Sequence, residues 1–257
     1  MIKLLLSFTR IRIIISFLRA FWYIKVKKKL NTFKDSTVNV HEHTIFSNLR
    51  RVVSNPDYPH PKARYLLGID LQQDGSKVRT LMNPVICIDK ISNNISNIKV
   101  LIIGPKLESE ILSVMSYGIP LRNIKAIDLI TYSPWVDQGD MHNLPYQDDT
   151  FDLIICGWVI AYSDDKQKAA EEMIRVSKNG CIIAVSATYS PKTNEEIEES
   201  RGYLIGSEER IEDTKFLNSL FSKNIGDIYF KHDVPEEAKQ DNGKIITIFG
   251  IQKPNHV

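Results

Sequence analysis

The sequence predicts an α/β protein with a mostly parallel sheet and one antiparallel strand at its edge. From residue 99 onward, apolar runs rich in β-branched residues recur, as is typical of strands covered on both faces. Helical segments alternate with these runs, which indicates parallel strands joined by right-handed crossovers. The last two apolar runs have only the polar stretch 235–242 between them, and this predicts the antiparallel strand.

The first half of this region contains two strands and one helix. Residues 99–104 (KVLIIG) form an apolar run, and Pro105 stops the strand because proline cannot donate to a sheet. Residues 108–117 (ESEILSVMSY) have helical character, and Gly118 stands where a helix ends in a residue with positive φ. Residues 123–129 (NIKAIDL) predict a second strand with an acid near its end.

The second half continues the alternation. Residues 164–176 (DDKQKAAEEMIRV) predict a helix with aspartates at its start and Arg175 near its end, charges that suit the helix dipole. The other predicted elements are strands within 151–160, 180–189, 226–233 and 244–253 and a helix over 214–220.

The chain before residue 98 is divided into two segments. Residues 1–30 are apolar but interrupted by Lys and Arg, so they lack the roughly 18 uncharged residues of a membrane span. We expect a basic apolar helix, which either lies on anionic lipid or packs on protein with its cations outward. Residues 31–97 are expected to be an irregular extension or cap, with 85–91 as a short strand or loop anchor. The α/β domain occupies 98–257.

Composition excludes several classes of protein. The chain has 257 residues, 43% of them apolar, and a formal charge of only +2, so no strong field favours nucleic acid. Its three cysteines lack a C-x-x-C spacing, which indicates reduced thiols. The protein is therefore expected in the cytoplasm, or at the inner face of the membrane if the N-terminal helix binds lipid. His41 and His43 have no third ligand nearby, so no metal site is expected.

Three features converge where the strands are expected to end. In open α/β sheets, ligands bind at the carboxyl ends of the strands. Gly104 ends the first strand and leaves room for a ligand beside the backbone. Asp128 ends the second strand, a position from which a carboxylate accepts hydrogen bonds from ribose hydroxyls. Asp140 and Met141 follow in a turn that can reach the base of a nucleotide.

These motifs resemble the class I S-adenosylmethionine-dependent methyltransferases, in particular the type 11-like domain. The strongest piece is D-M-x-x-L-P-Y-x-D-x-T-F-D from Asp140 to Asp152, and the resemblance covers about residues 98–190. It implies a Rossmann-like, seven-stranded sheet and S-adenosylmethionine as the cofactor. The implied cofactor residues are Gly104, Pro105 and Glu108 for the amino-acid end, Asp128 for the ribose, Asp140 and Met141 for the adenine, and Gly157 and Trp158 for the methionine portion. Leu129, next to Asp128, is also expected to contact the cofactor.

One motif departs from the family pattern. The family opens with an acid and G-x-G-x-G, whereas this chain has I-G-P-K at 103–106, with Glu108 or Glu110 as the replacement acid. Two readings stay open: a modified but active loop, or a fold retained as a binding or scaffold protein without catalysis. A nicotinamide-dependent oxidoreductase ranks third, because G-x-G-x-x-G is absent.

The sequence leaves the catalytic residues and the acceptor undetermined. Methyl transfer needs positioning above all, and a base only if the acceptor is protonated. Tyr162, Asp164 and His142 are the candidate bases. No N-P-P-Y motif follows the strand at 151–160, and the low charge disfavours nucleic acid, so we expect a small molecule, a glycan precursor or a lipid-linked acceptor.

Overall fold

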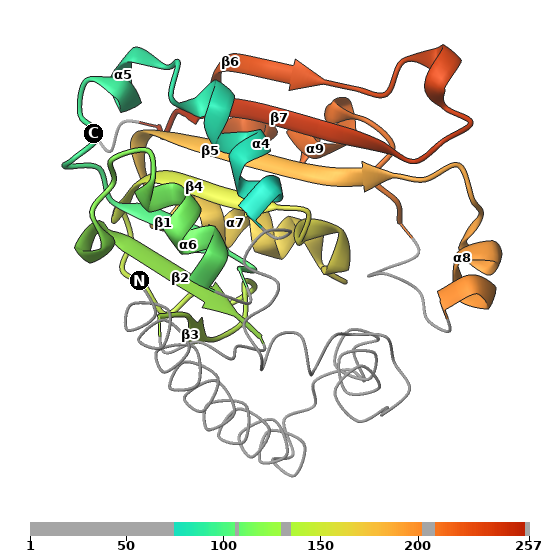
Figure 1. Ribbon diagram of the computed structural model, residues 1–257, viewed down its shortest axis with the longest axis horizontal. Coiled ribbons are helices and arrows are strands. Elements are labelled where there is room, and N and C mark those ends of the chain that lie inside the picture. Colours follow the sequence, from blue (N-terminus) through green and yellow to red (C-terminus); the bar gives the residue numbers. More distant parts are fainter. Residues whose placement is uncertain (1–74, 106–107, 130–134, 202–208, 255–257) are drawn as a thin grey trace, which may run out of the picture.

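The computed structural model describes residues 75–105, 108–129, 135–201 and 209–254 (Figure 1). These residues contain one seven-stranded sheet in the order β3-β2-β1-β4-β5-β7-β6. The strands are β1 (Val100–Ile103), β2 (Ile124–Asp128), β3 (Asp137–Gln138), β4 (Phe151–Gly157), β5 (Ser177–Tyr189), β6 (Ile225–His232) and β7 (Gly243–Ile251).

The sheet is mixed in the predicted way. Strands β1 to β5 pair in parallel, whereas β7 pairs antiparallel with both β5 and β6. The mostly parallel Rossmann-like sheet with antiparallel pairing at one edge is therefore confirmed. Strand β3 is the seventh strand that the resemblance implied, but its position was not predicted, since a strand of two residues carries no periodic pattern.

Helices cover both faces of the sheet (Figure 1). One apolar cluster joins the sheet to α7 and α9, and a second joins its other face to α4, α5 and α6. The side chains of β1 alternate between the clusters, which explains why this strand is apolar throughout. The helices are α4 (Gly75–Val85), α5 (Asp89–Ser92), α6 (Glu108–Met115), α7 (Lys166–Val176), α8 (Asn194–Arg201) and α9 (Thr214–Ser219).

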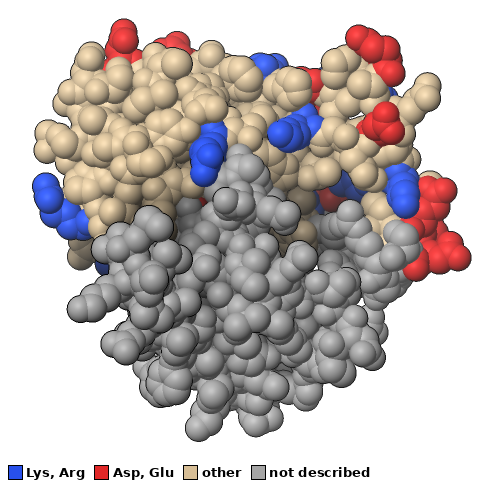
Figure 2. Space-filling view, in the orientation of Figure 1, with Lys and Arg blue, Asp and Glu red and all other residues tan. Residues whose placement is uncertain are grey.

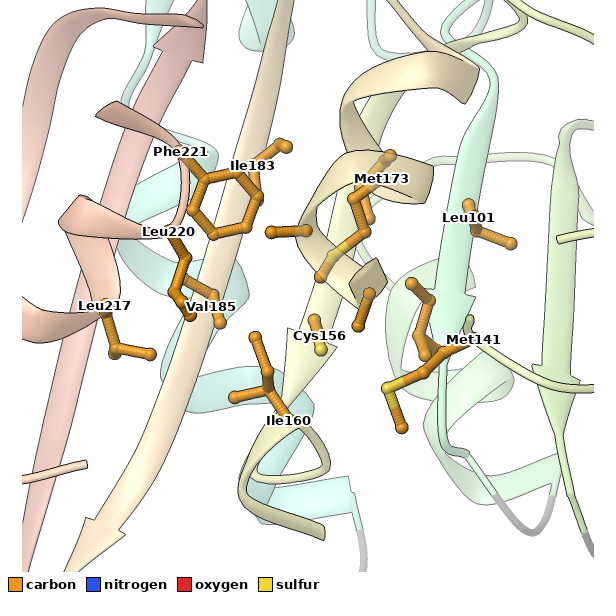
Figure 3. Close-up of a cluster of buried hydrophobic side chains, with 14 of the residues drawn as sticks. Leu101, Met141, Cys156, Ile160, Met173, Ile183, Val185, Leu217, Leu220 and Phe221 are labelled. Atoms are coloured by element: carbon orange, nitrogen blue, oxygen red, sulfur yellow. The ribbon is translucent and has the colours of Figure 1, made fainter. Parts of the chain in front are cut away.

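Figure 3 shows part of the first cluster. Met173 of α7 and Leu217 of α9 lie on either side of the side chains from β4 and β5. Cys156 on β4 is fully buried here, and burial raises the pKa of its thiol to about 12. This cysteine is therefore a packing residue that stays protonated, as is typical of buried structural thiols.

Residues 85–91 are not a strand. Val85 ends α4, and α5 begins at Asp89 after a turn. Val85 is buried with Leu81 and Met82 on one face of α4, at helical spacing. Ile88 and Ile91 pack in the same second cluster. Burial on one helical face is the physical reason for the difference from the expected strand or loop anchor.

Helix α8 is also additional to the predicted elements, although its sequence carries a start signal. The Thr193 hydroxyl accepts the Glu196 N–H at 3.2 Å, and the Glu196 carboxylate accepts the Thr193 N–H at 2.7 Å. This reciprocal pair is a capping box, which satisfies two donors at the helix start. The T-x-x-E spacing at residues 193–196 was the available signal.

Charges of both signs are scattered over the described face in Figure 2. Glu195 and Glu196 stand in the first turn of α8, where carboxylates suit the helix dipole.

No helix in the described part of the chain combines the length and apolar character that a membrane span requires. The predicted N-terminal helix over 1–30, the extension to residue 74, and His41 and His43 lie outside the described residues.

Candidate cofactor site

The structure brings the predicted site residues to one edge of the sheet. Gly104 follows β1, Asp128 ends β2 and Gly157 ends β4, and these strands pair in parallel. Asp140 follows β3, which pairs with the end of β2. Because carboxyl ends of neighbouring parallel strands meet at one edge, backbone and acidic groups from four strands gather there.

Gly104 is required by the fold itself. Its φ is +82°, and its N–H donates to the Ile127 carbonyl at 2.8 Å. A Cβ at this position would lie 2.6 Å from Cγ2 of Val159, which comes from the turn after β4. The sequence predicted that glycine leaves room for a ligand, whereas the structure shows that Val159 takes up the room on the Cβ side.

The ends of β2 and β3 are tied together. The Gly139 N–H donates to the Asp128 carbonyl at 3.0 Å, and Nε2 of Gln138 donates to the Leu129 carbonyl at 3.2 Å. Oε1 of Gln138 is buried and has no hydrogen-bond partner among the described residues. A buried acceptor without a partner is rare in proteins and marks a place where a ligand or water is expected to donate. Sequence reasoning missed Gln138, because a lone glutamine carries no motif.

Asp140 and His142 connect two loops of the site. Nδ1 of His142 lies 2.6 Å from Oδ1 of Asp140, and its Nε2 lies 2.6 Å from Oγ of Ser163. Oδ1 of Asp164 is 3.6 Å from the same Nε2. Asp140 follows β3 and Ser163 follows β4, so the imidazole bridges two segments. This order of groups is also that of an Asp–His–Ser hydrolase, but Ser163 is fully buried, so it offers no exposed nucleophile.

Met141 belongs to the core rather than to an open surface. It is 6% exposed and lies in the first apolar cluster, near Cys156 in Figure 3. Met141 therefore anchors the loop that carries Asp140, consistent with the usual packing role of methionine.

Three other predicted residues lie in different surroundings. Pro105 is buried and Glu108 begins α6, while Tyr162 is 40% exposed in the 3-10 turn Ile160–Tyr162.

Trp158 has a strained backbone at the end of β4. Its φ is +60°, a conformation that costs a non-glycine residue about 1 to 3 kcal/mol. Its N–H donates to the carbonyl and the hydroxyl of Ser186, at 3.0 and 3.1 Å. Ser186 is fully buried on β5, so the strain is maintained by a fixed partner. Strained residues of this kind cluster at functional sites.

A partly buried ion pair supports the loop after Asp140. Glu172 of α7 accepts the Leu144 N–H at 2.8 Å, and the Arg175 guanidinium contacts Glu172 at 2.7 Å. Arg175 also donates to the Leu144 and Tyr146 carbonyls, both at 2.8 Å. The sequence predicted only a dipole role for Arg175. Its larger role depends on contacts between segments far apart in the chain.

This ion pair predicts a specific acid sensitivity. The hydrogen bond from Arg175 holds the pKa of Glu172 below its ordinary value of 4.5, and the Leu144 N–H lowers it further. Because the folded-state pKa is lowered, the stabilisation is complete above the unfolded value and is lost as pH falls through the folded value. We expect Glu172→Gln to be less stable than wild type at pH 7 and to lose less stability between pH 5 and 3. Urea unfolding at several pH values measures this, and equal acid slopes would contradict it.

The sheet order, the helices on both faces and the acidic carboxyl-end site define the Rossmann-like methyltransferase fold. Residues 135–247 match a family model described as "Methyltransferase domain". The described residues hold no group of three or more His, Cys, Asp or Glu side chains that could bind a metal.

Short segments of the chain are similar to curated methyltransferases. Over 49 residues it is 47% identical to norajmaline N-methyltransferase of Rauvolfia serpentina, covering 19% of this chain and 17% of that protein. Over 46 residues it is 44% identical to demethylmenaquinone methyltransferase of Desulfitobacterium hafniense, covering 18% of each. The alignments span less than a fifth of either relative.

A solved structure shares the fold over a longer stretch. It is the N-methyltransferase NodS of Bradyrhizobium japonicum in complex with S-adenosyl-L-homocysteine. The TM-score is 0.51 at 12% identity, covering 82% of this chain and 100% of that one. At this identity the likeness shows a common fold.

Proposed function

We propose that this protein binds S-adenosylmethionine at the carboxyl edge of its sheet and transfers the methyl group to an acceptor. The observation that carries the proposal is the gathering of Gly104, Asp128, Asp140 and Gly157 at that edge. The methyltransferase-domain match over 135–247 supports it, since the match includes the loop of Asp140 and the end of β4.

The residues present fit the cofactor. Carboxylates end β2 and follow β3, where the ribose and the base are expected. Between them in the sequence lies Gln138, whose buried Oε1 has no partner among the described residues. When bound, the cofactor supplies an electrophilic methyl group on a sulfonium. The protein's part is to hold the reacting groups in line, which accounts for most of the rate in such a displacement.

The chemical class of the methyl acceptor is inferred from the charge of the protein. We propose a small molecule, a glycan precursor or a lipid-linked molecule, because the charge is near zero and the described face shows no continuous basic surface (Figure 2). Tyr162 and Asp164 stand in the turn after β4, where an acceptor would approach the methyl group. A screen for S-adenosylhomocysteine release, with and without anionic vesicles, separates soluble from lipid-linked acceptors.

Calorimetric titration with S-adenosylmethionine and S-adenosylhomocysteine tests the proposal, with NADH as the comparison ligand. We expect Asp128→Ala to weaken both interactions about 10- to 100-fold, since it removes a charged acceptor of hydroxyl hydrogen bonds. Asp227→Ala, on the exposed strand β6, is the matched control and is expected to bind as wild type does.

Each outcome of the titration has a distinct meaning. Unchanged affinity of Asp128→Ala would remove the ribose assignment. Binding of NADH alone would support the alternative hypothesis of a nicotinamide-dependent oxidoreductase. Binding of neither cofactor class by the wild type would favour a fold retained without catalysis, with Val159 packed on Gly104 as the structural reason.

A further inference from the structure

We propose that His142 is a positioning residue that fixes the Asp140 carboxylate for recognition of the adenine base. This inference rests on the proposed function, because it concerns the cofactor expected at this edge. His142 was a candidate base from the sequence. The structure instead gives both of its ring nitrogens a protein partner: Asp140 at 2.6 Å and Ser163 at 2.6 Å.

The chemistry of the partners assigns the protons. An ionised carboxylate can only accept, so Nδ1 of His142 carries the hydrogen that Asp140 accepts. In the neutral ring Nε2 is then an acceptor, and the Ser163 hydroxyl donates to it. Ser163 is fully buried and out of reach of bulk water, so this bond satisfies its hydroxyl.

The lone pair needed for a base is therefore already engaged. A general base must accept a proton from the acceptor, but Nε2 accepts one from Ser163 in this arrangement. The other facing groups are Asp164, 3.6 Å from Nε2, and Lys166, which donates to the Ser163 carbonyl at 3.2 Å. Partners at both ring nitrogens hold the ring in place between two loops, which suits a positioning role better than proton exchange with an acceptor.

His142 contacts Oδ1 of Asp140 through both its backbone and its ring. This oxygen accepts the His142 backbone N–H at 2.9 Å and faces the ring Nδ1 at 2.6 Å. The backbone bond sets one direction for the carboxylate, and the ring bond sets a second. The ring is in turn held by Ser163 in the turn after β4. The orientation of Asp140 thus depends on a segment that lies beyond β4 in the chain.

Two amide variants, each of which replaces one ring nitrogen of His142, separate this role from a purely structural one. Asparagine places an N–H donor near the position of Nδ1, and glutamine places its amide near that of Nε2. His142→Asn therefore keeps the bond to Asp140 and loses the one to Ser163, while His142→Gln does the reverse. If His142 acts through Asp140, His142→Asn is expected to bind S-adenosylhomocysteine within about threefold of wild type, and His142→Gln about tenfold more weakly.

A double-mutant cycle gives an independent test. We expect Asp140→Ala and His142→Gln each to weaken binding, and the double variant to bind no more weakly than Asp140→Ala alone, because coupled residues are not additive. The wild type should also prefer S-adenosylhomocysteine to its inosine analogue, and His142→Gln should lose that preference. Thermal unfolding of each variant confirms that the fold is retained.

The outcomes distinguish the two proposals. Equal binding by wild type and His142→Gln, or a double variant that loses the product of the two single effects, would overturn the role of His142 and leave the cofactor assignment intact. Absence of S-adenosylhomocysteine binding by the wild type would instead overturn the proposed function, and this inference with it.

Discussion

Replacing Gly104 by alanine is expected to lower the free energy of unfolding by about 2 to 4 kcal/mol. Two effects add. At φ +82° an alanine is strained, and its Cβ would lie 2.6 and 2.7 Å from Cγ2 and Cβ of Val159. The backbone of Val159 carries that Cβ, so relief requires the turn after β4 to move. Urea unfolding measures the effect, and calorimetry should show weaker cofactor binding as the turn shifts.

Gly118→Ala is the matched control for this experiment. Gly118 also has positive φ, at +100°, but a Cβ there would meet nothing closer than Ile95 at 3.8 Å. Its cost, about 1 kcal/mol, reports backbone strain alone. A Gly104→Ala variant no less stable than Gly118→Ala would show that Val159 yields without cost, and would contradict the close packing described above.

Removing the Arg175 guanidinium is expected to cost about 2 to 3 kcal/mol. Arg175→Ala leaves the Glu172 carboxylate buried without its partner and removes the donor from the Leu144 and Tyr146 carbonyls. The guanidinium is 32% exposed, so the cost is at the lower end for a buried pair. The loop that follows Asp140 should loosen, and S-adenosylhomocysteine should bind more weakly.

Two further variants make the Arg175 experiment specific. Lys239→Ala breaks the exposed pair with Glu236 and is expected to leave the unfolding midpoint unchanged. Glu172→Gln combined with Arg175→Ala removes the buried charge and keeps an acceptor for the Leu144 N–H. The double variant should lose less than the sum of the two single losses. Strict additivity would mean that the two side chains stabilise the fold separately.

Most of the sheet was predictable because its signals are local. Runs such as 99–104 must be apolar on every residue when both faces of a strand are covered, so the run itself indicates a buried strand. Glycine at 118 was predicted as a helix end with positive φ, and φ there is +100°. The capping box of α8 was equally local, and was missed only because its acidic helix has few apolar residues.

The candidate site was predictable only as far as strand ends can be read from the sequence. Gly104, Asp128, Asp140 and Gly157 were identified in this way, since parallel strands bring their carboxyl ends together whatever the side chains are. Strand ends carry no information about a side chain's partners. Met141 was predicted to reach the base, and the structure adds that its side chain packs in the core.

By itself, the sequence determined the alternation of strands and helices, the edge at which ligands are expected, and the acids at that edge. The tertiary structure decided what each residue there contacts. Val159 fills the space beside Gly104, Ser163 fixes His142, and Arg175 supports the loop of Asp140. The physical reason is that periodicity and turn chemistry act between near neighbours, while close packing and hydrogen-bond partners join segments that are distant in the chain.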